Sequence, residues 1–153
     1  MSAEFVHLHV HTQYSLLDGA VKVKDLVSRV AASGMRAVAV TDHGNMFGAI
    51  TFYKAAKEAK IQPILGCEVD VAGSGGRPCH LPLLAASAEG YKNLIWLVSR
   101  AQVKGAPLTM EEIAGRSKGL VGMTGCMGGL VAQSVRRPGP AGPRPDERRG
   151  SDA

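Results

Sequence analysis

The chain has 153 residues, of which 45% are hydrophobic and 20% are charged, so it can bury the core of one ordinary domain and is not disordered in bulk. The formal charge of +5 is no convincing footprint of a nucleic-acid-binding surface, because five of the eighteen basic residues fall in the last eighteen positions. Three cysteines without C-x-x-C spacing exclude a disulfide scaffold, and the lack of a signal peptide or a bilayer-length apolar run predicts a soluble, cytoplasmic protein with no membrane partner.

The first half of the chain alternates between strand-like and helix-like patterns. Apolar residues recur at helical spacing from Val23 to Val30, and Gly34 stands where such a helix would end. An almost unbroken run of Ala and Val follows, as in a buried parallel strand. We therefore expect an α/β plan, with strands over 5–12, 36–41 and 63–71 and helices over 22–33 and 47–59.

The second half predicts further elements of both kinds. A strand is expected over 80–86, followed by a long helix that opens at residue 87 and carries Leu94 and Leu97 on its apolar face. Thr109 and Glu112 have the spacing of a capping box, which predicts a short helix ending near Gly115. A strand over 119–124 and a short apolar helix through 130–131 complete the expected elements.

Beyond Val135 the composition changes abruptly. The segment 136–145 consists of Arg, Pro, Gly and Ala, which neither continue a helix nor contribute to a core. We therefore expect a domain over 4–135 and a disordered tail over 136–153. A frameshift or a truncated gene would also produce this change.

Residues that can bind metal recur at the ends of the expected strands. His9 and His11 are two residues apart in a strand and therefore share one face. By itself this pair is also compatible with a polar strand face, but further donors stand where later apolar segments pass into loops. They are Asp18, Asp42 and His43, Cys67 and Glu68, His80, and Cys126. Parallel strands present their carboxyl ends on one rim of a strand–helix barrel, so these donors should converge there.

The number of donors on that rim sets the kind of metal site. The seven donors that follow the His9–His11 pair already exceed what one tetrahedral zinc ion binds, so a cluster of two or three metal ions is the natural inference. Mixed imidazole and carboxylate donors suit zinc, manganese or iron.

Three strings of the sequence together resemble a known family. HLHVHTQYSLLDG at 7–19, TDHGNMFG at 41–48 and PILGCE at 63–68 closely resemble the start of bacterial DNA polymerase III alpha subunits. The similarity extends from about Glu4 to Val135. In that family this region is the polymerase and histidinol phosphatase (PHP) domain, a distorted (β/α)7 barrel with a metal cluster on its carboxyl rim. The resemblance implies an incomplete barrel of this type.

The resemblance also implies a ligand set, residue by residue. The family's metal ligands fall on His9, His11, Asp18, His43, Glu68, His80 and Cys126. Neither Asp42 nor Cys67 maps onto a ligand, and Asp42 is expected to orient a neighbouring imidazole instead. A thiolate ligand favours zinc, and the mixed donors leave manganese open. The family closes its cluster with an Asp-x-His pair on a late strand; no such pair follows Cys126, so two of nine ligands are missing.

For function, the resemblance implies DNA replication. The family's polymerase active site lies in later segments, so we expect this chain alone not to polymerise DNA. Its metal cluster is associated with phosphoester hydrolysis, including 3′–5′ removal of nucleotides, and the implied partners are DNA and other replicase subunits. Two alternatives stay open, namely a stand-alone phosphoesterase of the histidinol phosphatase type and a structural metal-binding module without turnover. The string GYKNL at 90–94 and the segment 47–53 favour the polymerase over free-standing phosphatases, and the string at 41–48 favours the replicative over the error-prone branch.

Overall fold

The computed structural model of the chain describes residues 5–73 and 77–135. The elements in these ranges are α1 (Val23–Ala32), β1 (Ala37–Val40), α2 (Ala49–Glu58), β2 (Gln62–Ala72), β3 (Pro78–Ala85), α3 (Ala88–Lys104), α4 (Met110–Ala114), β4 (Leu120–Gly122) and α5 (Leu130–Val135). Except for the first strand, the predicted elements are confirmed with shifts at their ends. The expected tail over 136–153 lies outside the described residues. No helix in the described ranges combines the length and hydropathy that a membrane span needs.

The four strands form one sheet in the order β1-β2-β3-β4. β1 and β2 are parallel, with Val38 opposite Pro63, as the α/β pattern predicts. β3 pairs antiparallel with both β2 and β4, so the parallel arrangement that was expected to bring strand ends to one rim does not extend to β3 and β4. The reason for the β2–β3 pairing is the connection from 73 to 77, which is far shorter than the dozen or so residues that a parallel crossover needs.

The segment 5–12 runs alongside β1 as an extended chain and not as a regular strand. Its backbone meets β1 at an isolated parallel bridge between His7 and Val38. At its end, the Thr12 N–H donates a hydrogen bond to the Asp42 carboxylate and not to a neighbouring strand. The predicted first strand therefore has the expected direction but lacks a continuous ladder.

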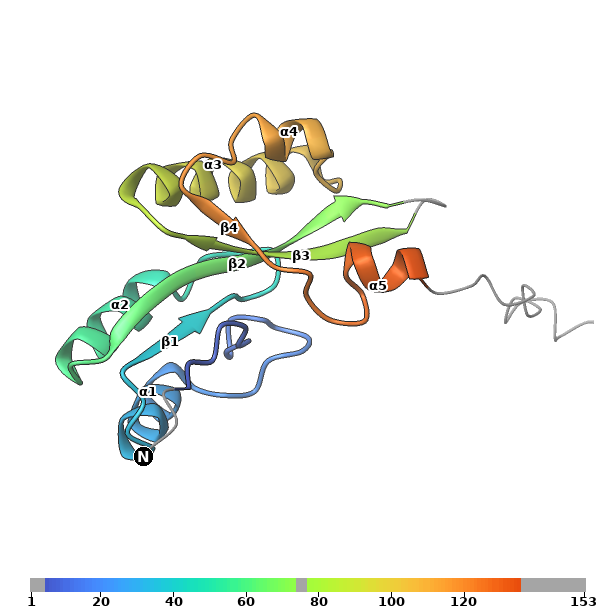
Figure 1. The fold of residues 1–153 in the computed structure, drawn as a ribbon. Coiled ribbons are helices and arrows are strands. Elements are labelled where there is room, and N and C mark those ends of the chain that lie inside the picture. Colours follow the sequence, from blue (N-terminus) through green and yellow to red (C-terminus); the bar gives the residue numbers. More distant parts are fainter. Residues whose placement is uncertain (1–4, 74–76, 136–153) are drawn as a thin grey trace, which may run out of the picture.

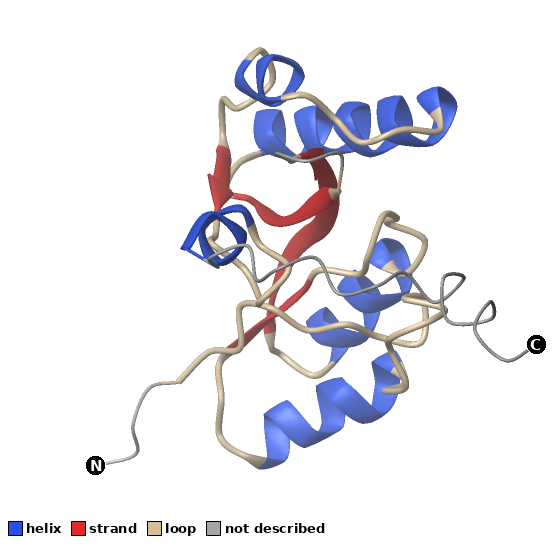
Figure 2. Ribbon diagram, turned by 90° about the vertical axis from the view of Figure 1, so that its right-hand side faces the viewer, coloured by secondary structure: helices blue, strands red, loops and turns tan. Residues whose placement is uncertain are grey.

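The buried apolar side chains form two clusters that meet along β2. The first, which we call core A, packs α1 and α2 against β1 around the fully buried Phe52. The second, core B, packs α3 and α4 against β2 and β3 around Leu94 and Leu97. Figure 1 shows the two helix pairs as separate groups along the twisted sheet, and Figure 2 shows the same division after a quarter turn. Leu65 on β2 packs on core A, whereas Cys67 belongs to core B.

Local sequence signals set the ends of the helices in core B. Ser87 caps α3 by accepting a hydrogen bond from the Gly90 N–H. Gly105 ends the same helix in the left-handed region, with φ of 62°. The predicted capping box between Thr109 and Glu112 is present at the start of α4.

Candidate metal centre

Glu68 stands in the middle of a cluster of imidazole side chains. It lies on β2 where the two cores meet, and its side chain is 1% exposed. One carboxylate oxygen, Oε1, is 3.3 Å from His9 Nε2. The other, Oε2, faces three rings, at 2.9 Å from His43 Nδ1, 3.3 Å from His80 Nδ1 and 3.4 Å from His11 Nε2. A buried carboxylate is costly unless charge or hydrogen bonds compensate it, and four imidazoles surround this one.

His9 and His11 reach Glu68 from the extended segment 5–12. Both rings project to the same side, as their spacing predicts, and their centroids are 5.0 Å apart. A hydrogen bond of 2.7 Å joins His9 Nδ1 to Thr41 Oγ1, so that Nε2 faces the carboxylate. Burial lowers the pKa of His9. The neutral imidazole, which has the lone pair that a metal ion needs, is thereby favoured.

His43 follows β1 and is fixed by the backbone around it. Its N–H donates to Ser15 Oγ at 2.9 Å, and its carbonyl accepts a hydrogen bond of 3.0 Å from Asn45 Nδ2. Burial acts to lower the pKa of His43, but the hydrogen bond to Glu68 and the charge of Asp70 outweigh burial, so the pKa is raised. The two ring nitrogens of His43 face carboxylates, Nδ1 that of Glu68 and Nε2 that of Asp70.

His80 and Cys126 enter the cluster from the other half of the chain. His80 is near the start of β3, as the strand expected over 80–86 implies, and it reaches the cluster because β3 is antiparallel to β2 and begins where β2 ends. Cys126 follows β4, with its Sγ 3.6 Å from His80 Nδ1. The Gly128 N–H donates to Cys126 Sγ at 3.3 Å, which orients the thiol towards the cluster.

Asp18 and Asp42 support the cluster from its edge. Asp18 Oδ2 is 3.3 Å from His11 Nδ1, the ring nitrogen on the side away from the central carboxylate, and Asp18 as a metal ligand stays a prediction. Asp42 accepts hydrogen bonds from the Thr12 N–H at 2.6 Å, the Thr12 hydroxyl at 2.9 Å and the Ser15 hydroxyl at 3.2 Å, and its role in orienting an imidazole stays a prediction. Its buried carboxylate thus fixes the turn that follows His11, because Thr12 opens that turn.

Asp70 is a member of the cluster that the sequence analysis missed. It lies two residues after Glu68 on β2, so the two side chains share a face of the strand, and its register partner on β3 is His80. Asp70 Oδ2 is 3.6 Å from His43 Nε2, and Oδ1 is 3.8 Å from His80 Nε2. The alternation of two carboxylates along one strand is the same signal that the pair of histidines gave.

The side chains brought together here fit divalent metal ions. Three buried atoms in the cluster have no hydrogen-bond partner within the described ranges, namely His11 Nε2, Glu68 Oε1 and Asp70 Oδ1. Buried polar atoms without a partner cost free energy, which metal coordination would offset. Three groups have ligand atoms within 4.8 Å of one another: His9, His11 and Glu68; His43, Asp70 and His80; and Glu68, His80 and Cys126. All the predicted ligands except Asp18 belong to these groups.

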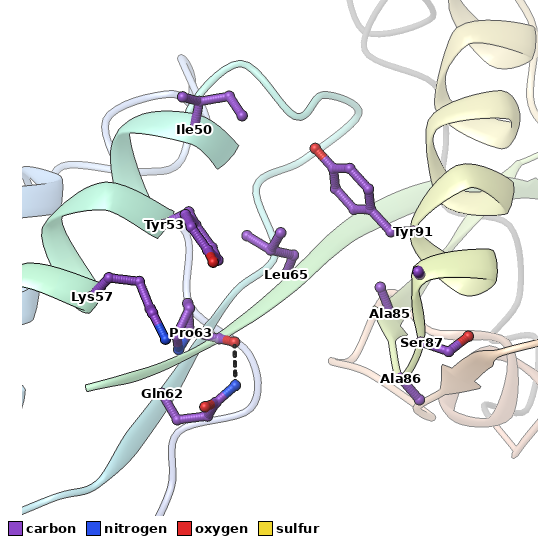
Figure 3. A pocket seen from close by; sticks show the side chains of 11 residues that line it. Ile50, Tyr53, Lys57, Gln62, Pro63, Leu65, Ala85, Ala86, Ser87 and Tyr91 are labelled. Carbon is purple, nitrogen blue, oxygen red and sulfur yellow. Dashed lines mark hydrogen bonds between the residues drawn. The ribbon is translucent and has the colours of Figure 1, made fainter. Parts of the chain in front are cut away.

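Two other features of the molecule supply no ligands. A groove of about 540 Å³ opens between α2 and α3 (Figure 3), lined by apolar and aromatic side chains that include Ile50, Tyr53, Leu65 and Tyr91. No imidazole, thiol or carboxylate lines it, so it offers nothing that a metal ion prefers. Burial raises the pKa of the Cys67 thiol, and Cys67 belongs to none of the three groups of ligand atoms.

The fold and the cluster define the class of protein. Residues 7–149 match the family described as the PHP domain, and the chain belongs to that family. The match continues past residue 135, where we placed the end of the domain, into residues outside the described ranges. That boundary therefore stays a prediction.

Within that class, the chain is similar to DNA polymerase III alpha subunits. It is 41% identical over 147 residues to the subunit from Borreliella burgdorferi, covering 87% of this chain and 13% of the relative. It is 40% identical over 149 residues to the subunit from Thermus aquaticus, covering 86% of this chain and 12% of the relative. The similarity is to the N-terminal region of these subunits, which confirms the resemblance seen in the sequence strings. The chain spans about one eighth of the length of these relatives.

Two solved structures resemble the fold. A putative metal-dependent phosphoesterase from Bifidobacterium adolescentis aligns with a TM-score of 0.53 at 18% identity, covering 76% of this chain and 44% of that one. An amidohydrolase from Chromobacterium violaceum, with bound sulfate and no metal, aligns with a TM-score of 0.50 at 26% identity, covering 65% of this chain and 34% of that one. These likenesses confirm the α/β fold of PHP type. The described strands form an open four-stranded sheet and not a closed barrel.

Proposed function

We propose that this chain is the N-terminal PHP region of a DNA polymerase III alpha subunit and that its cluster is a metal-dependent phosphoesterase site of the 3′–5′ exonuclease type. The observation that carries the proposal is the convergence of four imidazoles on the buried carboxylate of Glu68. Identity of about 40% to these subunits supports it. Because the chain spans only 11–14% of such relatives, polymerisation, DNA, the other replicase subunits and a cytoplasmic location all belong to the proposal.

The proposed cofactors are two or three divalent ions, with zinc favoured over manganese. The residues that would bind them are His9, His11, Asp18, His43, Glu68, His80 and Cys126. A soft thiolate from Cys126 together with imidazole nitrogens suits zinc, whereas the carboxylate oxygens leave manganese as the second choice. The number of ions follows from the number of donor groups, which exceeds the four ligands of one tetrahedral ion.

The residues of the chain have separate tasks in this proposal. When bound, the metal ions supply hydroxide near neutral pH and stabilise negative charge on phosphoryl oxygens. Thr41 orients the His9 ring through its Nδ1, and Glu68 positions four rings at once. Asp42 holds the turn after His11 through its hydrogen bonds to Thr12. This support keeps the rings in place, which effective metal catalysis requires.

Metal content is the first test of the proposal. Plasma mass spectrometry should find zinc or manganese in the purified chain and in an Asp25→Asn control, whose carboxylate is exposed on α1 away from the cluster. A His9→Ala/His11→Ala variant should lose the metal while its circular dichroism is retained. A parent chain without metal would refute the metal centre.

The second test concerns the reaction itself. In the full-length subunit, removal of a 3′-mismatched nucleotide from a 5′-labelled primer should stop in His43→Ala and continue in Asp25→Asn. His43 is chosen because its ring faces Glu68 at 2.9 Å. Undiminished removal by a folded His43→Ala variant would refute the exonuclease assignment for this cluster.

A further inference from the structure

We infer that His43 Nε2, His80 Nε2 and the Asp70 carboxylate together bind one divalent metal ion, at a position distinct from the group formed by His9, His11 and Glu68. The inference rests on the metal-binding role proposed above. It adds Asp70 as a ligand, which the resemblance to the polymerase family does not assign. The three side chains come from the loop after β1, from the end of β2 and from the start of β3.

The spacing around Asp70 differs from that of hydrogen bonds. Its Oδ2 is 3.6 Å from His43 Nε2 and its Oδ1 is 3.8 Å from His80 Nε2, whereas N–H···O hydrogen bonds span about 2.7–3.2 Å. Two donors bound to one tetrahedral zinc ion at about 2.0–2.1 Å are about 3.4 Å apart. The observed gaps are therefore closer to those of atoms that share a cation.

A buried oxygen of Asp70 also lacks a partner. Asp70 Oδ1 is inaccessible to solvent and makes no hydrogen bond within the described ranges. The strand register places Asp70 directly opposite His80, so the backbone of the β2–β3 hairpin holds this oxygen beside the ring. A cation at this point would satisfy the oxygen without moving either strand.

Glu68 orients the rings of both His43 and His80 towards the proposed ion. Its Oε2 is 2.9 Å from His43 Nδ1 and 3.3 Å from His80 Nδ1. When each Nδ1–H points to this oxygen, each Nε2 carries the lone pair, and both Nε2 atoms lie on the side of Asp70. A carboxylate behind a metal-binding imidazole is a common way to fix its tautomer and orientation.

The experiment is a zinc titration against a competing chelator, with the number of bound equivalents and their affinity as readouts. Asp70→Asn should bind one equivalent fewer than the parent chain, or bind it with affinity reduced by more than about 10-fold. Asp25→Asn, the same change at an exposed carboxylate on α1, should match the parent. Asp70→Glu keeps a carboxylate and should retain the equivalent.

Folding is controlled separately from metal binding. With excess chelator, Asp70→Asn should retain the circular dichroism of the parent, because Asp70 Oδ1 makes no hydrogen bond that the amide would break. With zinc, the parent should gain more in unfolding temperature than Asp70→Asn does, since a ligand that binds the native state stabilises it.

The possible results separate this inference from the proposed function. Equal zinc equivalents and equal affinities in the parent and Asp70→Asn would overturn the role of Asp70 and leave the proposed function standing. If Asp70→Asn does not fold, loss of the equivalent in a folded Asp70→Glu would overturn the inference and its retention would support it. A parent chain that binds no zinc would overturn both proposals.

Discussion

The two halves of the sheet bring side chains to one cluster through different connections. In the half built on core A, β1 and β2 are parallel, and His43 follows the carboxyl end of β1. In the half built on core B, β3 runs back along β2, so His80 is near the amino end of β3, beside Asp70 near the carboxyl end of β2. Both arrangements place donors at the same edge of the sheet. The edge that a residue occupies, and not the direction of its strand, therefore decides whether it joins the cluster.

The shared element in this comparison is β2. Its first part contacts core A through Leu65, and its later part contributes Cys67, Val69 and Val71 to core B. Glu68 lies on the same strand and receives rings from both halves. We therefore expect the cluster to depend on the integrity of both cores, and variants of each core can test this dependence.

The largest expected effect comes from truncating one large buried side chain in either core. Phe52→Ala in core A should lower the free energy of unfolding by about 3–5 kcal/mol, and Leu97→Ala in core B by about 2–5 kcal/mol, because both side chains are fully buried. Urea denaturation followed by circular dichroism measures the loss. Both variants should also bind zinc more weakly than the parent, since each core carries part of the cluster. Unchanged zinc affinity in one clearly destabilised variant would show that the cluster depends on one half alone.

A smaller effect is expected where α3 crosses β4 in the half built on core B. A Cβ on Gly90 would overlap the backbone carbonyl of Gly119, which cannot move as a flexible side chain would. Gly90→Ala should therefore cost about 1–3 kcal/mol. Gly115→Ala is the matched control, because its nearest neighbour, Glu111 O, is 3.4 Å away. Equal unfolding free energies for the two variants would contradict this close approach.

The sequence predicts local features of both halves well. The periodicity of the apolar residues and Gly34 predict α1 of core A, and four residues of sequence predict the capping box at Thr109. These signals succeed because they act within a turn or two of chain. The direction of β3 depends on the short connection from 73 to 77, since its buried apolar run reads equally well in either direction.

Only some residues of the cluster can be predicted from the sequence, because the others are identified only by contacts with distant parts of the chain. His9 and His11 stand out because two imidazoles rarely alternate along an apolar segment. Asp70 lies between Val69 and Val71 and resembles the solvent-facing position of any alternating strand, until the register places it opposite His80. The hydrogen bonds of Asp42 depend on which side chains fold back onto it, those of Thr12 and Ser15, and no pattern in the sequence indicates these contacts.

The smallest expected effect concerns the capping box of α4, which belongs to core B. The hydrogen bond from the Thr109 N–H, followed by that from Arg100, lowers the pKa of Glu112 to about 2. A carboxyl with a lowered pKa in the folded state contributes stability above its unfolded pKa, near 4.3, and loses this contribution as the pH falls to the folded value. The parent should therefore unfold at a slightly higher temperature than Glu112→Gln at about pH 6, and the difference should shrink between about pH 4 and pH 2. Thermal melts followed by circular dichroism measure it, and a difference that is constant over this range would show that the charge of Glu112 does not stabilise the start of α4.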